Sequence, residues 1–475
     1  MHLSLTRGKK ITLAILGTLI LGSLLLFFYA KDHREEFAAG GFAIFEKVSQ
    51  LLPLEADTKK EIEAIGTLVS ALSKQDDTTR TFFLMLQNNY ELRPGGGFLG
   101  QYAILKIKNG KIISFDFEDA NLLDQRIKNA KIKITPPWPL TRYAQIKRWM
   151  LRDSNFSPDF PTNANKVEYF YRLGGGREKL DGVIAINADV LNHIIGVVGP
   201  ITIDGFGTYT AENAAIDLEE DVEKAYLGEE VPAAVKENRK NVMKRLAAEI
   251  VSRVSSLSDI QKLSALGLEE LRSKNIQLFF KDPELQKQVE EVHWDGSVSK
   301  NWNKDYLMIV DANLGALKTD YYIRRSLEYT VDFTGEKPKA TVLYSYNHTA
   351  TAGNWRTSDY HTYTRILAPS GSKYIEESRV KTGGVSSQES PEWNKMVFGY
   401  KVDALIGTVL PTSISYELPA SITPDNYELL IQKQSGTGTI PVKVTLKTKD
   451  REYIQNAELL HDLRFSIRSV DKEKK

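Results

Sequence analysis

An arginine followed by a proline and three glycines stands out among the segments that could do chemistry. Pro94 favours extended backbone geometry at Arg93. The glycines Gly95, Gly96 and Gly97 permit backbone angles that turn successive N–H groups towards one point, an arrangement that binds anions. An arginine beside such a nest suits a phosphate or a carboxylate. The alternative is a tight turn between strands in which Arg93 pairs with a structural carboxylate.

A second polar segment places Arg152 directly before Asp153, with Asp159 further along the same segment. Carboxylate oxygens are ligands for hard divalent cations, so Asp153 and Asp159 are candidate Mg²⁺ ligands, with Arg152 on an anionic group. The alternative is that Asp159 caps the helix that follows and that the segment is an ordinary loop.

Composition excludes several kinds of site. The chain has no cysteine, which rules out disulfides, thiol nucleophiles and Cys-ligated metals. Its 7 histidines form no H-E-x-x-H pattern, so a zinc hydrolase is not indicated. With 62 Lys and Arg against 61 Asp and Glu, the chain has no overall basic character, and nucleic acid is not an expected partner.

A membrane anchor is expected near the N-terminus. Residues 11–30 carry no charge, and a helix of this length spans the roughly 30 Å hydrocarbon core of a bilayer. Basic residues in 1–10 favour a cytoplasmic N-terminus, which places the following domains outside the cell membrane. A cleaved signal peptide is the alternative; it is disfavoured because the apolar stretch is long and ends in a poor cleavage site.

The elements that would position the polar segments follow the anchor. Helical spacing of apolar residues predicts a juxtamembrane stalk at 31–75. Residues 76–321 alternate strand and helix patterns and predict a mixed α/β domain, with a hairpin turn at Asn109-Gly110. Helical periodicity then disappears, and about seven short strands predict an antiparallel β-sandwich of immunoglobulin-like size at 322–470. Residues 471–475 form a charged tail.

Four sequence blocks indicate a family. In chain order they are LQNNYELRPGGGFLG, RDSNFSPDFP, LDGVIAINADVLNHIIGVVGPI and DYLMIVDANLGALKTDYYIRR. Together they resemble the bacterial surface proteins catalogued as domain of unknown function 4012 (DUF4012). The predicted sandwich and single anchor agree with that family's layout. The resemblance implies a place at the cell envelope and no particular activity.

A more distant resemblance concerns the run YFYRLGGGREKLDGVIAINADVLNHIIGVVGPITI. It is similar to the closing part of LytR-CpsA-Psr proteins, membrane-anchored enzymes that transfer polymers from a polyprenyl-phosphate carrier to peptidoglycan. That resemblance implies a site in which Arg93, Arg152 and Arg172 hold the pyrophosphate and Asp153 helps to hold Mg²⁺. The chain departs from the family's pattern, because no proline precedes Arg152 and Gly199-Pro200 stands where Gly-Gly is expected.

Two functions are expected from these observations. The first is a membrane-anchored, extracytoplasmic protein whose α/β domain binds an anionic ligand such as a polyprenyl-phosphate-linked glycan. It is either a binder of that lipid phosphate or a transferase of a wall polymer, in which Mg²⁺ would stabilise the transferring phosphoryl group. The second is a non-catalytic adhesion or assembly protein of the envelope. Convergence of Arg93, Arg152 and Asp153 in a cleft beside an apolar tunnel would favour the first. Side chains scattered over separate surfaces would favour the second.

Overall fold

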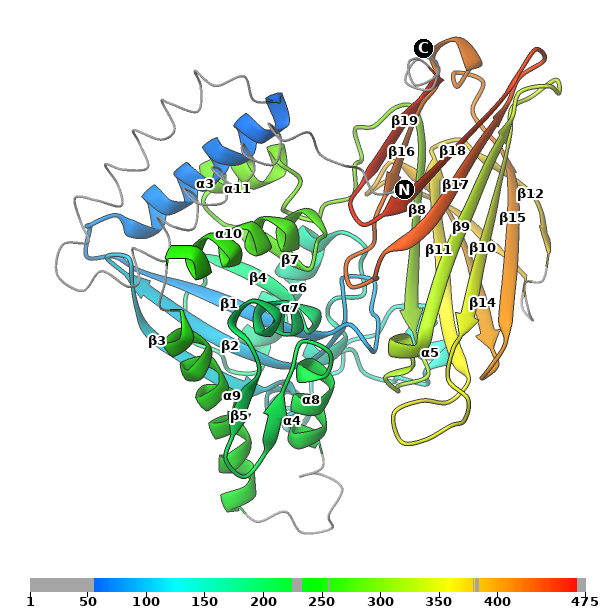
Figure 1. Ribbon diagram of the computed structural model, residues 1–475. Coiled ribbons are helices and arrows are strands. Elements are labelled where there is room, and N and C mark those ends of the chain that lie inside the picture. Colours follow the sequence, from blue (N-terminus) through cyan, green and yellow to red (C-terminus); the bar gives the residue numbers. More distant parts are fainter. Residues whose placement is uncertain (1–54, 224–232, 255–256, 379, 381–383, 468–475) are drawn as a thin grey trace. The chain divides into compact units, whose positions relative to one another are not determined.

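The computed structural model describes residues 55–223, 233–254, 257–378, 380 and 384–467. The predicted cytoplasmic N-terminus, membrane anchor and charged tail lie outside these residues. No helix within the described ranges is long and apolar enough to cross a membrane. The described chain divides into two compact units, each of which gathers separate stretches of the sequence (Figure 1).

The first unit is a mixed α/β fold on a five-stranded sheet. It comprises the described residues up to Leu86, together with Gln101–Asp119 and Arg177–Asp295. The strands are β1 (Thr79–Asn88), β2 (Phe98–Lys108), β3 (Lys111–Asp119), β4 (Gly182–Asn187) and β7 (Ile276–Phe280), in the order β3-β2-β1-β4-β7. An unbroken apolar run buries β1 on both faces, as suits a central strand, whereas no residue of the edge strand β3 is fully buried.

The predicted hairpin is confirmed. Strands β2 and β3 pair antiparallel on either side of Asn109-Gly110. Both turn residues have positive φ, 49° and 69°, which is the geometry that a two-residue turn between strands requires.

Helices complete the first unit. On one face of the sheet, α3 (Ala56–Ser73), α10 (Leu257–Arg272) and α11 (Pro283–Glu291) share a hydrophobic cluster with the strands. A smaller cluster joins α7 (Asp189–Val198), α8 (Ala214–Glu223) and α9 (Ala233–Arg253) to the hairpin of β5 (Ile201–Ile203) and β6 (Gly207–Tyr209). The predicted stalk at 31–75 is wrong for α3, because Ile62, Ile65 and Val69 are buried with Phe82 and Leu84 of β1.

The second unit is a sandwich of two six-stranded sheets. One sheet has the order β12-β15-β10-β9-β17-β18, from β9 (Ile323–Asp332), β10 (Lys339–His348), β12 (Lys373–Ser378), β15 (Val409–Glu417), β17 (Ile440–Lys447) and β18 (Glu452–Leu459). The other has the order β13-β14-β11-β8-β16-β19, from β8 (Asp305–Asn313), β11 (Tyr360–Pro369), β13 (Ser386–Ser390), β14 (Lys395–Ala404), β16 (Glu428–Gln432) and β19 (Leu463–Ser466).

One hydrophobic core joins the two sheets of the sandwich. It takes Tyr329 and Val342 from one sheet and Ile366, Phe398 and Leu429 from the other. All seven predicted strands are present in these sheets. The expectation of a purely antiparallel sandwich is wrong, because β16 pairs parallel to β8 and β17 pairs parallel to β9.

The boundary of the sandwich also differs from the prediction. Strand β8 lies between β11 and β16, so the segment that carries the strands of the sandwich begins at Gly296 rather than at residue 322. All nine residues of β8 are buried, and such a run fits the centre of an α/β sheet as well as the centre of a sandwich. Its membership in the sandwich is decided by its pairing with β11 and β16, which are distant in sequence.

Two earlier stretches belong to the sandwich unit as well, Gln87–Gly100 and Ala120–Gly176. The second contains the helices α4 (Ala120–Asn129), α5 (Trp138–Tyr143) and α6 (Phe160–Leu173) and the short turn η1 (Leu151–Asp153). Two further short turns are η3 (Thr319–Tyr322) and η4 (Pro424–Asn426). Leu140 and Phe156 from the second stretch pack with Ala312 of β8, which fixes it on the sandwich.

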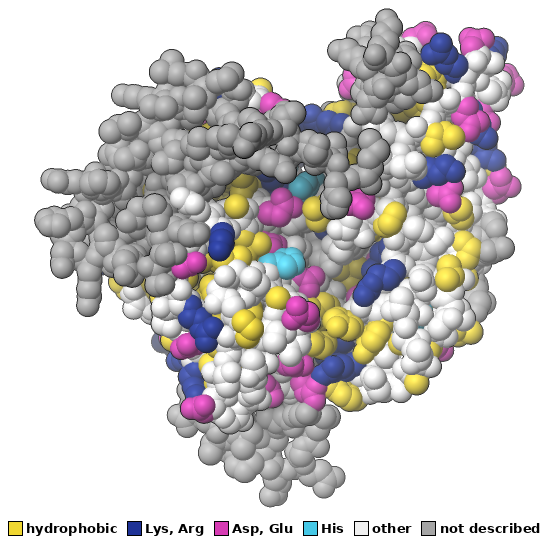
Figure 2. Space-filling model, viewed as in Figure 1, with side chains coloured by type: hydrophobic (Ala, Val, Ile, Leu, Met, Phe, Trp, Pro, Cys, Tyr) yellow, Lys and Arg dark blue, Asp and Glu magenta, His cyan; other side chains and the backbone are white. Residues whose placement is uncertain are grey.

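Charged side chains of both signs are interspersed on the face of the molecule drawn in Figure 2. Yellow apolar side chains appear between them in small groups. This mixture agrees with the formal net charge of +1.

A buried carboxylate lies at the start of β8. Asp305 is fully buried and accepts hydrogen bonds from the hydroxyl groups of Tyr427 (2.6 Å) and Tyr329 (3.0 Å). Burial raises the pKa of Asp305 to about 7, although the two hydroxyl groups and the Tyr306 N–H partly stabilise the charged form. Burial is the largest of these effects, so the ionised form is disfavoured in the folded state.

We expect Asp305 to give the sandwich a pH-dependent stability. In the unfolded chain its pKa is about 3.9. Between that value and about 7 the folded state holds a proton that the unfolded state has lost, so the free energy of unfolding falls as pH rises through this window. Denaturant unfolding at pH 5 and pH 8 should therefore show a smaller decline for Asp305→Asn than for the wild type, by up to roughly 2–3 kcal/mol. Equal declines would contradict this assignment.

Candidate functional site

The glycine turn uses its N–H groups inside the protein. Gly95 donates to the carbonyl oxygen of Asn155 (3.0 Å), and Gly96 donates to the carbonyl oxygen of Arg93 (2.9 Å). Gly97 donates to Oε1 of Gln87 (2.8 Å). Each of the three donors predicted to form an anion-binding nest thus has an internal acceptor. The geometry agrees with the alternative expectation, a tight structural turn.

The glycines are explained by close packing. A Cβ atom on Gly97 would lie 2.3 Å from the backbone of Asn88, and one on Gly95 would lie 2.3 Å from Nδ2 of Asn163. Gly96 has a φ of 133°, which L side chains rarely adopt. On the opposite side, a Cβ on Gly436 would lie 2.0 Å from the carbonyl oxygen of Gly96. The turn is therefore enclosed by the unit that contains it.

Arg93 lies in the interior of the sandwich unit, with 4% of its surface exposed. Its Nη2 donates to Oε1 of Glu91 (2.8 Å), and its Nη1 donates to the carbonyl oxygen of Asn313 at the end of β8 (2.7 Å). Nε of Arg93 faces Oδ1 of Asp153 at 3.6 Å, an ion pair too long for a hydrogen bond. The guanidinium also lies over the ring of Phe98, 5.2 Å from its centre.

Burial and charge act in opposite directions on this group. Burial raises the pKa of Glu91 and of Asp153, while the nearby Arg93 partly offsets the rise in each. For Arg93, burial lowers the pKa, but the charges of Glu91 and Asp153 outweigh it and hold the pKa above its usual value. A permanently charged guanidinium therefore stabilises two carboxylates that would otherwise be costly to bury.

A second buried ion cluster adjoins the first and was not predicted. Arg325 of β9 donates from Nε to Asp311 (2.8 Å) and from Nη2 to Asp320 (2.6 Å). Oδ2 of Asp320 in turn accepts the N–H of Leu92 (3.0 Å), next to Arg93. These residues lie in the block DYLMIVDANLGALKTDYYIRR, which was recognised in the sequence as one of the four family blocks. Their spacing gave no indication that they form ion pairs.

Gln434 joins the two clusters from a distant part of the chain. Its Nε2 donates to the carbonyl oxygens of Arg93 (3.1 Å) and Asp311 (2.8 Å), and its Oε1 accepts the N–H of Asp311 (2.8 Å). Gln434 is 3% exposed. Nothing in the local sequence marks it, since an isolated glutamine is usually a surface residue.

Arg152 lies at the border of this region and is partly exposed. Its Nε donates to Oδ2 of Asp124 (2.7 Å), and the other oxygen of Asp124 accepts the N–H of Leu151 (2.9 Å). Burial raises the pKa of Asp124, and the hydrogen bond and charge of Arg152 partly offset the rise. Asp124 therefore fixes Arg152 and the turn η1 in one place.

Asp159 and Arg172 have structural partners of their own. Asp159 caps α6 by accepting the N–H of Thr162 (3.1 Å), and its other oxygen accepts the N–H of Val298 (3.0 Å). Arg172 is exposed and forms an ion pair with Glu168, one turn back on α6 (3.5 Å). The alternative expectation for Asp159, a helix cap, agrees with this geometry.

The structure therefore brings together some of the predicted residues. Arg93 and Asp153 meet in the interior, with Arg152 beside Asp153 in the sequence. Asp159 and Arg172 instead contact other partners, described above. Within the described residues, no group of three or more His, Asp or Glu side chains is placed to hold a metal ion. Arg93 and Asp153 are buried and hold the turn in place, whereas Arg152 is partly exposed.

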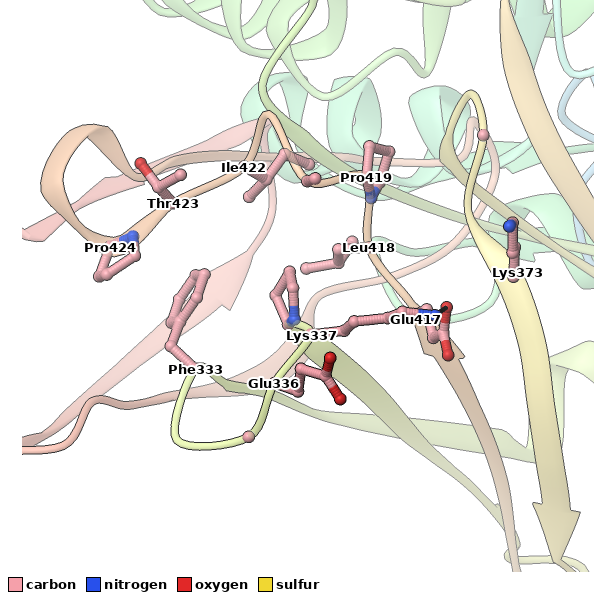
Figure 3. A pocket seen from close by; sticks show the side chains of 14 residues that line it. Phe333, Glu336, Lys337, Lys373, Glu417, Leu418, Pro419, Ile422, Thr423 and Pro424 are labelled. Atoms are coloured by element: carbon pink, nitrogen blue, oxygen red, sulfur yellow. Dashed lines mark hydrogen bonds and ion pairs between the residues drawn. The ribbon is translucent and has the colours of Figure 1, made fainter.

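The pocket drawn in Figure 3 lies elsewhere in the sandwich unit. It has a volume of about 450 Å³ and is lined by the turn between β9 and β10 and by the segment after β15. At its wall, Nζ of Lys337 and the carboxylate of Glu417 form an ion pair at 3.1 Å. A second pocket, of about 650 Å³, belongs to the α/β unit and is lined by α3, β1 and the start of α11. Neither pocket contains a predicted site residue.

Replacing Arg93 with alanine should destabilise the fold. The change leaves Glu91 and Asp153 buried without their cation, so we expect the free energy of unfolding to fall by about 3–5 kcal/mol. Denaturant unfolding of the purified protein measures this directly. Arg172→Ala is the matched control, because its exposed ion pair should contribute less than about 1 kcal/mol. Equal stability of the two variants would show that Arg93 is not a structural residue.

Comparison with known proteins finds a family similarity for one part of the chain. A search of curated proteins finds no significant match. Residues 77–222 match the model of a family described as "Protein of unknown function (DUF4012)". The match begins just before β1 and ends within α8, so it includes the glycine turn and the segment from Arg152 to Asp159 but not β8. Residues 77–222, a part of the chain, are thus similar to the DUF4012 family.

Proposed function

We propose that this chain is a non-catalytic binding or assembly protein of the bacterial envelope. The proposal rests on one observation: the polar groups that a catalytic site would need already form hydrogen bonds and ion pairs inside the protein. Arg93 and the N–H groups of Gly95–Gly97 have partners within one folded unit. Polar groups with such internal partners stabilise the fold. A ligand could bind them only by breaking these hydrogen bonds and ion pairs.

The transferase expectation receives less support. A pyrophosphate at Arg93 would have to displace the carboxylate of Glu91 and enter a site in which the arginine is 4% exposed. The catalytic role expected of Arg93, Arg152 and Asp153 and the distant resemblance to LytR-CpsA-Psr proteins remain predictions.

The residues present do not suit Mg²⁺. This ion prefers near-octahedral oxygen ligation and keeps several waters. Asp153 instead faces the positive guanidinium of Arg93 and is 3% exposed. Asp159 already accepts two backbone N–H groups. We therefore derive no catalytic step through a metal ion.

A binding role is supported by the construction of the sandwich unit. Segments from three parts of the sequence are joined by the buried ion pair of Arg93 with Asp153, by the hydrogen bond from Arg93 to Asn313 and by a shared apolar core. Such a unit presents its loops and outer faces in fixed positions, which lowers the entropic cost of binding a partner. The proposal places a rigid recognition unit at the cell surface.

The envelope location rests on residues 11–30, the uncharged stretch behind a basic N-terminus. Reporter enzymes fused after residue 36 should therefore be active when the reporter works only outside the cytoplasm. A reporter that requires the cytoplasm should be inactive at the same position. The reverse result would refute the orientation.

Native mass spectrometry tests the non-catalytic role. Protein extracted from its own membranes should carry no stoichiometric polyprenyl phosphate, because the arginine sites are occupied by protein carboxylates. A one-to-one lipid complex that disappears in Arg152→Gln, without loss of thermal stability, would overturn the proposal. Arg172→Ala serves as the control, since its ion pair lies on the surface of α6.

A further inference from the structure

One segment of the chain departs from its balanced charge. Between Asp124 and Asp153 there are eight lysine or arginine residues and no aspartate or glutamate. They are Arg126, Lys128, Lys131, Lys133, Arg142, Lys147, Arg148 and Arg152. The whole chain, by comparison, has a formal net charge of +1. We call residues 125–152 the basic segment.

Apolar side chains hold the basic segment in place on the sandwich unit. Ile127, Leu140 and Leu151 are buried, and Leu140, Ile146 and Trp149 pack with Ala312 of β8. The N–H of Trp149 donates to the carbonyl oxygen of Ile134 (2.8 Å), which holds the two arms of the segment side by side. The segment is thus a fixed part of the surface.

The basic side chains of this segment point outward. Lys128, Lys131, Lys133, Arg142 and Lys147 are all exposed. Arg152 pairs with Asp124. Within the described part of the chain, no ion pair is found for the five exposed residues or for Arg148. Unpaired cations gathered in one exposed segment attract polyanions, because binding releases the counterions that surround the polymer.

Aromatic rings lie among these cations. Trp138 is 48% exposed and lies edge-on to Tyr363, with 5.1 Å between ring centres. Tyr143 stacks on Tyr363 at 5.8 Å, and the guanidinium of Arg142 lies 5.5 Å from the ring of Tyr143. A supported, partly exposed indole offers a flat apolar face to a ring of a bound polymer.

We propose that the basic segment, with Trp138, is a binding surface for an anionic polysaccharide. The inference rests on the proposed binding role and names its ligand class. Lysine and arginine side chains would pair with carboxylate or phosphate groups along the polymer, while Trp138 would contact a sugar ring. Surface clusters of basic residues bind acidic polysaccharides by this electrostatic mechanism.

A lipid bilayer fits the surface less well. Interfacial binding needs an apolar face that enters the membrane. Among the described residues of the basic segment, Trp138 is the one large apolar side chain that is strongly exposed, and the others are buried or partly buried. Nucleic acid would meet the same charges, but the proposed location outside the cytoplasm disfavours it.

Binding of the full-length protein in detergent to polygalacturonate tests the inference, with neutral dextran as the control polymer. We expect salt-sensitive binding to polygalacturonate and none to dextran. The triple variant Lys128→Gln, Lys131→Gln, Lys133→Gln should bind more weakly, and the slope of log Kd against log salt should fall by roughly two. Trp138→Ala should weaken binding roughly five- to a hundredfold with little change of that slope.

The matched control is a triple variant with the same loss of charge elsewhere in the sandwich unit, Lys300→Gln, Lys373→Gln and Lys449→Gln. These exposed lysines lie outside the basic segment. At physiological salt their charges are screened from it, so affinity should stay within about twofold of the wild type. Equal loss in the two triple variants would overturn the inference, because it would indicate general charge attraction.

Two further probes separate other partners. Binding to phosphatidylglycerol vesicles or to a single-stranded oligonucleotide, without binding to polygalacturonate, would overturn the polysaccharide assignment. Absence of binding to every probe would overturn it as well. Neither result would refute the non-catalytic role, which fails only if the native protein carries the lipid phosphate described above.

Discussion

The buried guanidinium of Arg93 is the interaction on which the sandwich unit depends. It neutralises Glu91 and Asp153 and donates to the end of β8. A charge in the interior is tolerated only when it is paired and hydrogen-bonded, because desolvation otherwise costs several kcal/mol. Three segments meet at Arg93: its own, the one that supplies Asp153 and the one that supplies the carbonyl oxygen of Asn313. Removing any of them would leave a buried polar or charged group without its partner.

This constraint accounts for the glycine turn beside it. The turn approaches Asn88, Asn163 and Gly436 so closely that side chains at Gly95 and Gly97 would overlap their neighbours. Gln434, which binds the carbonyl oxygen of Arg93, is 341 positions away in the sequence. Closing so long a loop costs conformational entropy, and the buried ion pairs and the shared core offset that cost. The unusual motif is thus a consequence of packing.

The family match has boundaries that do not coincide with a folding unit. Residues 77–222 contribute β1–β4 to the α/β unit, but they also supply 87–100 and 120–176 to the sandwich unit. The first stretch buries Arg93 against β8 and Gln434, and the second packs apolar side chains on β8; both partners lie outside the match. A sequence family can therefore describe segments whose structural partners lie elsewhere in the same chain.

Much of the local structure follows from sequence alone. The turn at Asn109-Gly110, the apolar stripe of α3 and the seven predicted strands of the sandwich are set by backbone preference and side-chain periodicity, which act between near neighbours. The absence of cysteine and the uncharged stretch at 11–30 are likewise properties of the sequence. Arg93 and Asp153 could also be selected from the sequence as candidate site residues, because each lies in a segment with an unusual combination of charged residues, proline or glycine.

Their role was decided by the tertiary structure. Burial and pairing depend on contacts between distant residues, so sequence could not distinguish an anion site at Arg93 from an internal ion pair with Glu91. Contacts between distant residues also placed β8 in the sandwich. A fully buried strand has no alternation of apolar and polar residues from which its partners could be predicted. The basic segment combines both kinds of information. Its excess of positive charge can be read from the sequence, but only the folded structure shows which of its apolar residues are buried and which of its cations are exposed.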